Sequence, residues 1–403
     1  MKQRLLGKTP EELKEIALAA GLPAFAGKQM AQWLYGKRVR SVEEMTNLSK
    51  AGREALSKDW EVGYNAPVDC QTSADGTKKY LFEVRCPVVA GHDGIVAAGQ
   101  EEVSCIEAVM IPDQERKTLC VSSQAGCKMG CKFCMTGRQG FHGNLSAADI
   151  LNQFFAIEEA GELTNTVFMG MGEPLDNWEA VRRVTEILTA PWGLGWSPKR
   201  VTLSTIGVLP KLRQFLDESH CHLAVSLHNP FGEERLEMMP AQKAWPLEDV
   251  VNLIRQYDFT GQRRVSFEYT VFAGWNDTKR HADALLRLLQ GLECRVNLIR
   301  FHRIPDFPYG PAPLEQMEAF RDRLTRGGVT ATIRASGGKT FLLHAACWPE
   351  NTKNYETASD LSVRNCIPGS GCPGAGPFLL HLRPGSQGCP GGAEHPEPDG
   401  PDP

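Results

Sequence analysis

The chain has 403 residues, which is long for one ordinary domain, and it has a globular composition with 42% hydrophobic and 23% charged residues. It contains no apolar run long enough for a transmembrane helix and no signal-peptide pattern at the N-terminus, so we expect a cytoplasmic protein without a membrane partner. The formal net charge of −4 neither demands nor excludes a nucleic acid, because binding needs only a local basic face.

The first 60 residues have a helical pattern. Thr9, Pro10 and Glu12 form a typical helix N-terminus, with a capping hydroxyl, a proline at the first helical position and an early acid. We expect residues 1–60 to form a small helical accessory domain that docks RNA. Residues 61–105 predict a β-rich connection with a loop over 91–99.

From 106 to 336, β-rich apolar stretches alternate with helical ones. Strands are expected at TLCVSS, TVFMGM, RVTLST, HLAVSLH, VSFEYTVF, CRVNLIRFH and VTATIRAS, and a helical stretch such as WEAVRRVTEILT follows most of them. Repeated strand–helix units predict an α/β fold with a parallel sheet and helices outside it, either barrel-like or doubly wound. The ends of the strands would then carry the chemistry.

The regular alternation ends at Ser336. The last 38 residues, 366–403, contain nine prolines and nine glycines, a composition that does not favour a packed core. We expect residues 337–403 to be an irregular tail.

The chain has thirteen cysteines, and a cytoplasmic protein of this size does not need disulfides to stabilise its core. Three of them, Cys127, Cys131 and Cys134, have the spacing C-x₃-C-x₂-C. Three thiolates on a short loop can bind three irons of a [4Fe–4S] cluster and leave the fourth iron without a protein ligand. A zinc site is the alternative, with His142 as the fourth ligand that zinc needs.

One strand–helix unit later, the next strand ends in Gly170-Met-Gly-Glu173-Pro174, where glycines permit a close backbone approach and a carboxylate can meet a cationic ligand. Together with the cysteines, this motif resembles the radical S-adenosylmethionine (SAM) superfamily. The segments TLCVSSQAGCKMGCKFCMTGRQGF, GMGEPL, RVTLSTIGVLPKL and LAVSLHNP resemble one branch of it, the adenine carbon-2 methyltransferases of 23S rRNA and tRNA. This resemblance covers residues 1–336.

The resemblance implies a partial (β/α)₆ radical SAM barrel, a [4Fe–4S] cluster and SAM as cofactors, and one-electron cleavage of SAM to a 5′-deoxyadenosyl radical. It also implies an electron donor of the flavodoxin or ferredoxin type. The implied cluster ligands are Cys127, Cys131 and Cys134. The implied SAM contacts are Gly172, Glu173, Pro174, Ser204, Ser226, Leu227, His228 and His302, the last at a position where many members have asparagine.

In this family a cysteine carries the methyl group to the base. One SAM methylates a C-terminal cysteine, the radical from a second SAM takes a hydrogen from that methyl group, and the resulting carbon radical adds to the adenine. Glu107 matches the glutamate assigned to proton transfer. Cys120 matches the cysteine that resolves the protein–RNA adduct by forming a disulfide with the methyl carrier.

The methyl carrier is the point at which the chain departs from the family. The candidate is Cys347 in Ala-Ala-Cys, eleven residues after Ser336, whereas the family cysteine is two residues closer. Codons chosen for the family sequence Ser-Arg-Gly-Glu-Asp-Ile-Phe-Ala-Ala-Cys-Gly-Leu-Leu-Ala, read with one base deleted, translate to residues 336–349 of this chain. The hypothesis is that the chain from residue 337 onward is out of frame; the alternative is a divergent but genuine C-terminus.

Two other functions stay open at this point. One is methylation of carbon 8 of the same kind of adenine, an antibiotic-resistance activity. The other is a protein that binds a cluster and RNA but does not turn over, because its methyl carrier is out of register.

Overall fold

The computed structural model describes residues 2–90, 95–261 and 263–334. The predicted tail, 337–403, and Cys347 within it lie outside the described residues. Within these residues, no helix has both the length and the apolar character needed to cross a bilayer.

The N-terminal part is built from short elements. The predicted helix start is confirmed, because the Thr9 hydroxyl accepts a hydrogen bond from the Glu12 amide at 3.2 Å and the Thr9 amide donates to the Glu12 carboxylate at 2.7 Å. The elements are β1 (Gln3–Arg4), α1 (Pro10–Ala19), α2 (Ala26–Ala31), the π-helical η1 (Gln32–Lys37), the 3-10 turn η2 (Val42–Glu44), α3 (Lys50–Asp59) and β2 (Trp60–Glu61).

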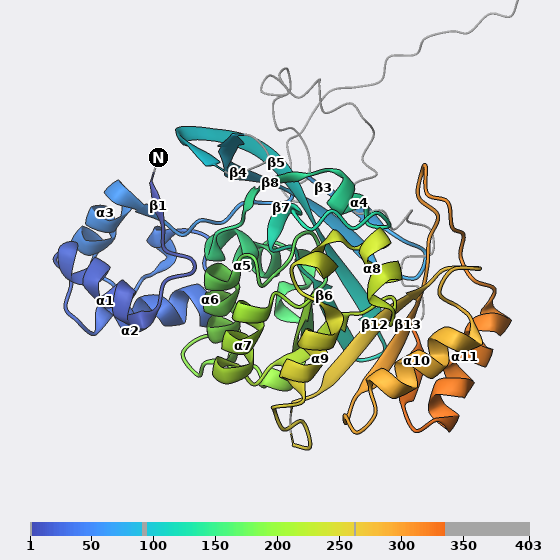
Figure 1. The fold of residues 1–403 in the computed structure, drawn as a ribbon. Coiled ribbons are helices and arrows are strands. Elements are labelled where there is room, and N and C mark those ends of the chain that lie inside the picture. Colours follow the sequence, from blue (N-terminus) through green and yellow to red (C-terminus); the bar gives the residue numbers. More distant parts are fainter. Residues whose placement is uncertain (1, 91–94, 262, 335–403) are drawn as a thin grey trace, which may run out of the picture. The chain divides into compact units, whose positions relative to one another are not determined.

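A ten-stranded sheet forms the centre of the molecule (Figure 1). Three strands pair antiparallel at one side: β3 (Asp69–Thr72), β4 (Lys78–Ala90) and β5 (Ile95–Asp113). The other seven are parallel: β6 (Arg116–Cys120), β9 (Asn165–Phe168), β10 (Val201–Thr205), β11 (His222–Ser226), β12 (Val265–Val271), β13 (Arg295–Arg300) and β14 (Thr330–Ile333). The loop expected over 91–99 is wrong in part, because strand β5 already begins at Ile95.

The parallel strands lie in the order in which they occur in the chain, each beside the one before it. In a doubly wound sheet the order of the strands would reverse at the first strand. The barrel-like alternative is therefore the correct one. The described sheet ends at β3 and β14 and does not close, which confirms an α/β fold with a partial barrel.

Helices connect the parallel strands and pack in pairs, with α5 beside α6, α7 beside α9 and α10 beside α11 (Figure 1). Their apolar faces cover one side of the sheet, where Leu203, Val225 and Phe267 are buried. These helices are α5 (Ala147–Phe155), α6 (Trp178–Thr189), α7 (Leu209–Glu218), α8 (Gly232–Met238), α9 (Leu247–Ile254), α10 (Lys279–Leu288) and α11 (Leu314–Arg326), with the short turns η3 (Glu158–Gly161), η4 (Pro198–Arg200) and η5 (Pro240–Lys243).

The other face of the sheet carries polar residues. Ser226 pairs with Glu268 in register, and Glu268 pairs with Asn297 on the next strand. The buried Glu268 carboxylate accepts hydrogen bonds from Asn297 Nδ2 at 2.8 Å and Ser266 Oγ at 3.0 Å. Because side chains alternate along a strand, this face is the inner, polar side of the barrel.

Candidate active site

The predicted site residues follow the carboxyl ends of the parallel strands. Strand β6 leads into the cysteine loop, β9 leads into residues 170–174, β11 leads into Leu227 and His228, and β13 leads into His302. Carboxyl ends of parallel strands meet at one edge of a sheet, which is where sites in such folds lie. The structure therefore brings these segments together at one mouth of the barrel.

The cysteine loop is held by a small hairpin that the sequence did not predict. Strands β7 (Gln124–Gly126) and β8 (Phe141–Asn144) pair antiparallel at its two ends. Inside the loop, the Cys127 amide donates to Gly140 O at 2.7 Å and the Cys134 amide donates to Cys131 O at 3.1 Å, where α4 (Met135–Arg138) begins. Backbone hydrogen bonds therefore order the loop that carries the three cysteines.

All three cysteines of the loop have free thiols. Burial, with a further contribution from Glu173 and Cys134, raises the pKa of Cys127 to about 12, and burial together with Cys134 and Cys127 raises the pKa of Cys131. A cationic centre bound by these thiols would favour their thiolate forms and oppose this effect of burial.

The arrangement fits a cluster better than a zinc ion. A closed structural zinc site needs a fourth ligand besides the three cysteines. His142, the proposed fourth zinc ligand, is exposed on β8. Three free thiols on one loop are the donor set that binds three irons of an iron–sulfur cube.

The glycine motif after β9 packs tightly against the segment that precedes the cysteine loop. Gly172 has φ +98°, and a Cβ at this position would lie 2.5 Å from Gln124 Cβ, so only glycine fits. The Glu173 side chain is 3% exposed. Its carboxylate accepts hydrogen bonds from Thr205 Oγ1 at 2.6 Å, Leu175 N at 3.1 Å and Ile206 N at 3.0 Å.

The Glu173 carboxylate therefore points toward the end of β10. Its hydrogen bonds connect the segment after β9 to the end of β10. Burial raises the pKa of Glu173 to about 7, although the three hydrogen bonds oppose that shift. At the same edge, Ser204 lies on β10 and Ser226 is the last residue of β11, with Pro174 following the glutamate.

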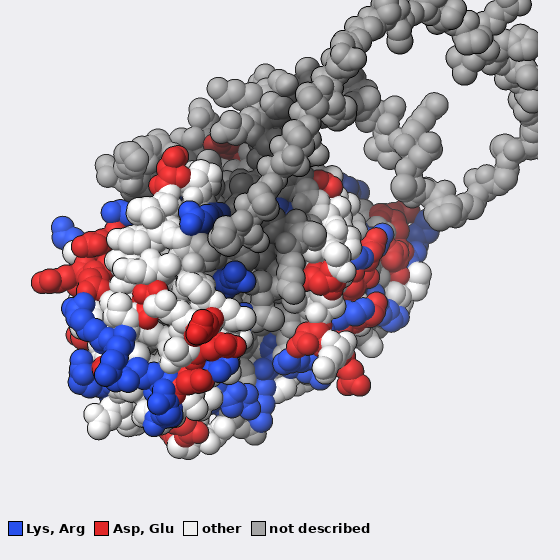
Figure 2. All heavy atoms as spheres, turned by 90° about the vertical axis from the view of Figure 1, so that its right-hand side faces the viewer, with Lys and Arg blue, Asp and Glu red and all other residues white. Residues whose placement is uncertain are grey.

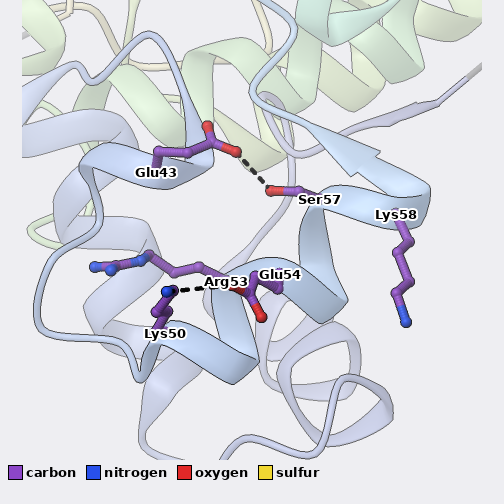
Figure 3. Close-up of a pocket in the computed structure, with 6 residues that line it drawn as sticks. All are labelled: Glu43, Lys50, Arg53, Glu54, Ser57 and Lys58. Carbon is purple, nitrogen blue, oxygen red and sulfur yellow. Dashed lines mark hydrogen bonds and ion pairs between the residues drawn. The ribbon is translucent and has the colours of Figure 1, made fainter.

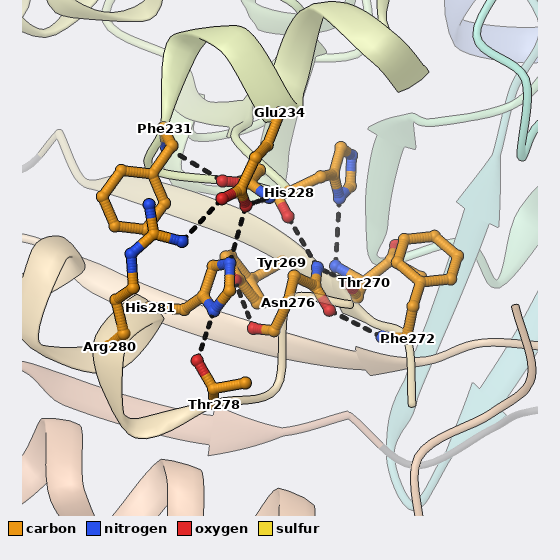
Figure 4. Close-up of polar contacts among 11 residues, drawn as sticks. His228, Phe231, Glu234, Tyr269, Thr270, Phe272, Asn276, Thr278, Arg280 and His281 are labelled. Carbon is orange, nitrogen blue, oxygen red and sulfur yellow. Dashed lines mark hydrogen bonds and ion pairs between the residues drawn. The ribbon is translucent and has the colours of Figure 1, made fainter. Parts of the chain in front are cut away.

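His228 follows β11 in a left-handed conformation with φ +56°. Its Nδ1 accepts a hydrogen bond from Thr270 N at 3.0 Å, and its carbonyl accepts one from Asn276 Nδ2 at 2.7 Å (Figure 4). Burial lowers the pKa of His228 to about 3, so the ring is neutral, and the bond at Nδ1 assigns the proton to Nε2. The ring also meets Phe133 of the cysteine loop edge-on at 4.9 Å.

A polar network behind His228 was missed by the sequence analysis. Asn276 is fully buried and also donates to Thr270 O at 2.8 Å and accepts from Phe272 N at 2.8 Å. Next to it, Glu234 binds His281 Nε2 at 2.8 Å (Figure 4). No periodic pattern marks these residues, because their partners come from separate loops and helices.

Glu107 and Cys120 lie on the adjacent strands β5 and β6. The Cys120 register partner is Val109, two residues along β5 from Glu107, so both side chains share the inner face of the sheet. Glu107 is 7% exposed, and its carboxylate lies 3.4 Å from Lys79 Nζ. Burial raises the pKa of Cys120 to about 11, while the nearby Arg334 guanidinium lowers it and Glu107 raises it.

Other surfaces carry less information about the site. The pocket in Figure 3 lies on the N-terminal elements and contains none of the predicted site residues. Its charged groups are partly paired with one another, since Ser57 donates to Glu43 at 3.0 Å and Lys50 lies 4.0 Å from Glu54. On the face shown in Figure 2, Lys and Arg are interspersed with Asp and Glu.

Comparison with known proteins decides the family. Residues 121–286 match the Radical SAM superfamily, and residues 3–62 match the ribosomal RNA large subunit methyltransferase N-terminal domain. The chain is 53% identical over 358 residues to the probable dual-specificity RNA methyltransferase RlmN of Porphyromonas gingivalis, covering 89% of this chain and 99% of the relative. The chain belongs to the RlmN family.

Two further similar proteins agree with this assignment. The probable RlmN of Phocaeicola vulgatus is 53% identical over 363 residues, covering 90% of this chain and 99% of the relative. A solved radical SAM methyltransferase from Sphaerobacter thermophilus is 35% identical with a TM-score of 0.73, covering 82% of this chain and 95% of that chain. As a radical SAM methyltransferase of the RlmN family, the protein uses a [4Fe–4S] cluster and SAM.

Proposed function

We propose that this chain methylates carbon 2 of a specific adenine in 23S rRNA and of an adenine in tRNA. The observation that carries the proposal is the gathering of the cysteine loop, the glycine–glutamate motif and the end of β11 at one mouth of a partial barrel, in a chain of the RlmN family. An adenine must leave its stack to reach such a mouth, which favours RNA loops as substrates.

Three of the proposed roles concern the cofactors. Cys127, Cys131 and Cys134 would hold the cluster, because they are neighbouring free thiols on one ordered loop. When bound, the cluster and SAM supply the 5′-deoxyadenosyl radical and the methyl group. Gly172, Glu173 and Pro174 would contact the amino group of SAM, and the Glu173 carboxylate itself is engaged by Thr205 and the Ile206 amide.

The remaining SAM contacts would come from the other strand ends. The neutral His228 offers its Nε2 proton as a hydrogen-bond donor and, by its fixed backbone, positions Ser226 and Leu227 before it. Ser204 and the exposed His302 complete the proposed set from β10 and from the segment after β13.

Two residues of the inner face have proposed roles in the later steps. The buried Glu107, held beside Lys79, would take the proton that leaves carbon 2. Cys120 would resolve the protein–RNA adduct, for which its thiol must first lose its proton, and Arg334 favours that loss. Cys347 is the candidate methyl carrier under the in-frame alternative.

The organisation of the chain is proposed on the same basis. Residues 1–60 form the RNA-docking accessory domain, 61–105 a β-rich connection, 106–336 the radical SAM core and 337–403 the tail. The protein acts in the cytoplasm and receives its electron from a flavodoxin- or ferredoxin-type donor.

The test is an anaerobic assay of the purified protein. Iron and sulfide quantitation should give four irons per chain, and a single zinc would overturn the cluster. Reduced protein incubated with methyl-labelled SAM and 23S rRNA or tRNA should give 2-methyladenine by mass spectrometry. Label on carbon 8, or RNA binding without methyl transfer, would establish one of the alternative functions.

The out-of-frame tail needs a separate test. Sequencing the locus should reveal an in-frame Cys-Gly-Leu-Leu one base away from the present reading. If no such sequence is found, the C-terminus is genuine and Cys347 is the residue to replace with alanine in the methylation assay.

A further inference from the structure

Arg235 is the largest side chain that is completely buried in the described part of the chain. It lies on α8, and its guanidinium reaches the ends of two strands. It donates to Leu227 O at 3.0 Å, to Ser226 O at 3.0 Å and to Ile206 O at 3.3 Å. A fourth bond, of 2.5 Å, goes to Gln242 Oε1. All four acceptors are neutral.

Burial of a guanidinium costs free energy when no negatively charged group lies close to it. Arg235 forms no ion pair within 4 Å with any carboxylate of the described residues. Burial lowers its pKa to about 10, so it still carries a full charge at neutral pH. Hydrogen bonds to carbonyls satisfy its donors but leave the charge itself unneutralised.

The position of α8 shows which negative group can oppose this charge. One helical turn after Arg235, Met238 O accepts a hydrogen bond from the Lys132 amide of the cysteine loop at 3.0 Å. Helix α8 is therefore docked directly on that loop. Lys132 directly follows Cys131 in the chain, so this hydrogen bond holds the helix that carries Arg235 against one of the proposed cluster ligands.

We propose that Arg235 is a built-in counter-cation of the iron–sulfur cluster and raises its reduction potential. The inference rests on the proposed cluster ligands and goes beyond them. One electron from an external reductant makes the cube with its three thiolates more negative by one charge. A fixed cation beside it stabilises the reduced form more than the oxidised form, since net charge and nearby dipoles set the potential of such centres.

The sharpest test neutralises the charge without removing the side chain. In Gln242→Glu, the acceptor of Arg235 becomes a carboxylate of the same shape, so the guanidinium keeps its four bonds and gains an ion-pair partner. The reconstituted full-length protein is titrated with dithionite under argon and followed by electron paramagnetic resonance. We expect the equilibrium constant for reduction of the cluster to fall at least tenfold. For a one-electron couple this corresponds to a reduction potential that is lower by at least 59 mV.

Further variants separate charge from structure. Arg235→Met should lower the potential in the same direction, and Arg235→Lys, which keeps the charge, should restore most of it. Arg263→Gln is the matched control, because Arg263 also donates to two backbone carbonyls, Leu216 O and Phe215 O, but precedes β12 at the opposite end of the sheet. Its potential should equal that of the wild type.

An unchanged potential in a Gln242→Glu protein that holds four irons would overturn the inference. If Arg235→Met does not fold, Gln242→Glu decides alone. A wild-type protein without four irons would refute the proposed cluster itself, so the two failures are distinguishable.

Discussion

Glu173 is a carboxyl group whose protonation is coupled to folding. Its pKa is raised by burial from 4.5 to about 7, so its contribution to stability is fully present below pH 4.5 and is lost as the pH rises through 7. We expect the free energy of unfolding of the apoprotein to fall by about 3 kcal/mol from this group between pH 4.5 and 8. Urea titrations at a series of pH values measure this slope.

The slope should be smaller in Glu173→Gln, which cannot ionise, even though the amide loses one of the backbone hydrogen bonds. Glu162→Gln is the control, because Glu162 is exposed and pairs with Lys117 at the surface. An identical slope in Glu173→Gln and the wild type would contradict the assignment.

Cys120 should react slowly with alkylating agents despite its proposed role. With a pKa of about 11, about one thiol in a thousand is ionised at pH 8, and the alkylation rate should rise about tenfold per pH unit up to pH 11. Peptide mass spectrometry of apoprotein treated with iodoacetamide measures the rate. Arg334→Gln should slow it further, because the guanidinium lowers this pKa, whereas the exposed Cys70 should be unaffected.

Residues within continuous motifs could be placed from the sequence, whereas residues that act through distant contacts could not. The cysteine spacing and the glycine motif identify positions along the chain, and parallel strands then bring them to one edge. Thr205 and Arg235 show no such signal. Thr205 donates a hydrogen bond to Glu173, which is 32 residues away in the chain. A charged residue on a short helix, such as Arg235, is expected to be exposed unless its partners are known.

Asn276 lies in the segment between β12 and α10. Its hydrogen bonds hold this segment against the residues that follow β11 at the mouth of the barrel. Replacing Asn276 by alanine leaves His228 O, Thr270 O and Phe272 N without their buried partner. We expect a loss of about 3 kcal/mol or more in the free energy of unfolding. We also expect weaker SAM binding, measured by calorimetry, since His228 loses its anchor.

Asn252→Ala is the matched control for this element. Asn252 is exposed on α9, where it accepts a hydrogen bond from Arg255 at 3.1 Å. A surface change of this kind should alter stability by less than about 0.5 kcal/mol. Equal losses in the two variants would show that the buried amide does not hold the segment.

Among the elements, amphipathic helices and apolar strands followed from their periodicity, but α5 and the β7–β8 hairpin did not. Seven consecutive residues of α5, from Ala148 to Phe154, are buried. Its polar side, with Asp149, Asn152 and Gln153, therefore contacts other segments of the protein, whereas the polar face of a surface helix contacts solvent. The hairpin strands are only three and four residues long, too short for a period to show.

At the scale of the whole molecule, the larger of the two hydrophobic clusters of the described residues includes buried side chains from Leu5 to Ala331. The N-terminal elements share it: the Tyr35 ring lies 5.8 Å from the Trp192 ring, and Glu12 pairs with Arg183 of α6 at 3.1 Å. We therefore expect a single unfolding transition, with coincident tryptophan fluorescence and circular dichroism curves.

Tyr35→Ala should lower the free energy of unfolding by about 3 kcal/mol or more and shift both curves together. The Tyr35 ring is fully buried, and its hydroxyl donates a hydrogen bond to Lys8 O at 2.6 Å. Phe25→Ala, at a side chain that is 63% exposed, is the control. Two separated transitions would mean that the N-terminal elements fold independently.

Because the parallel strands all run in the same direction, the turns at their amino ends lie far from the mouth and are suitable places for a label. The turn between α10 and β13 lies at the amino ends of the strands, opposite the catalytic mouth. Its Gly291 is exposed with φ +75°, and no described atom lies within 4 Å of where a Cβ would stand. A fluorophore or an affinity peptide inserted there can report on RNA capture while leaving the chemistry untouched.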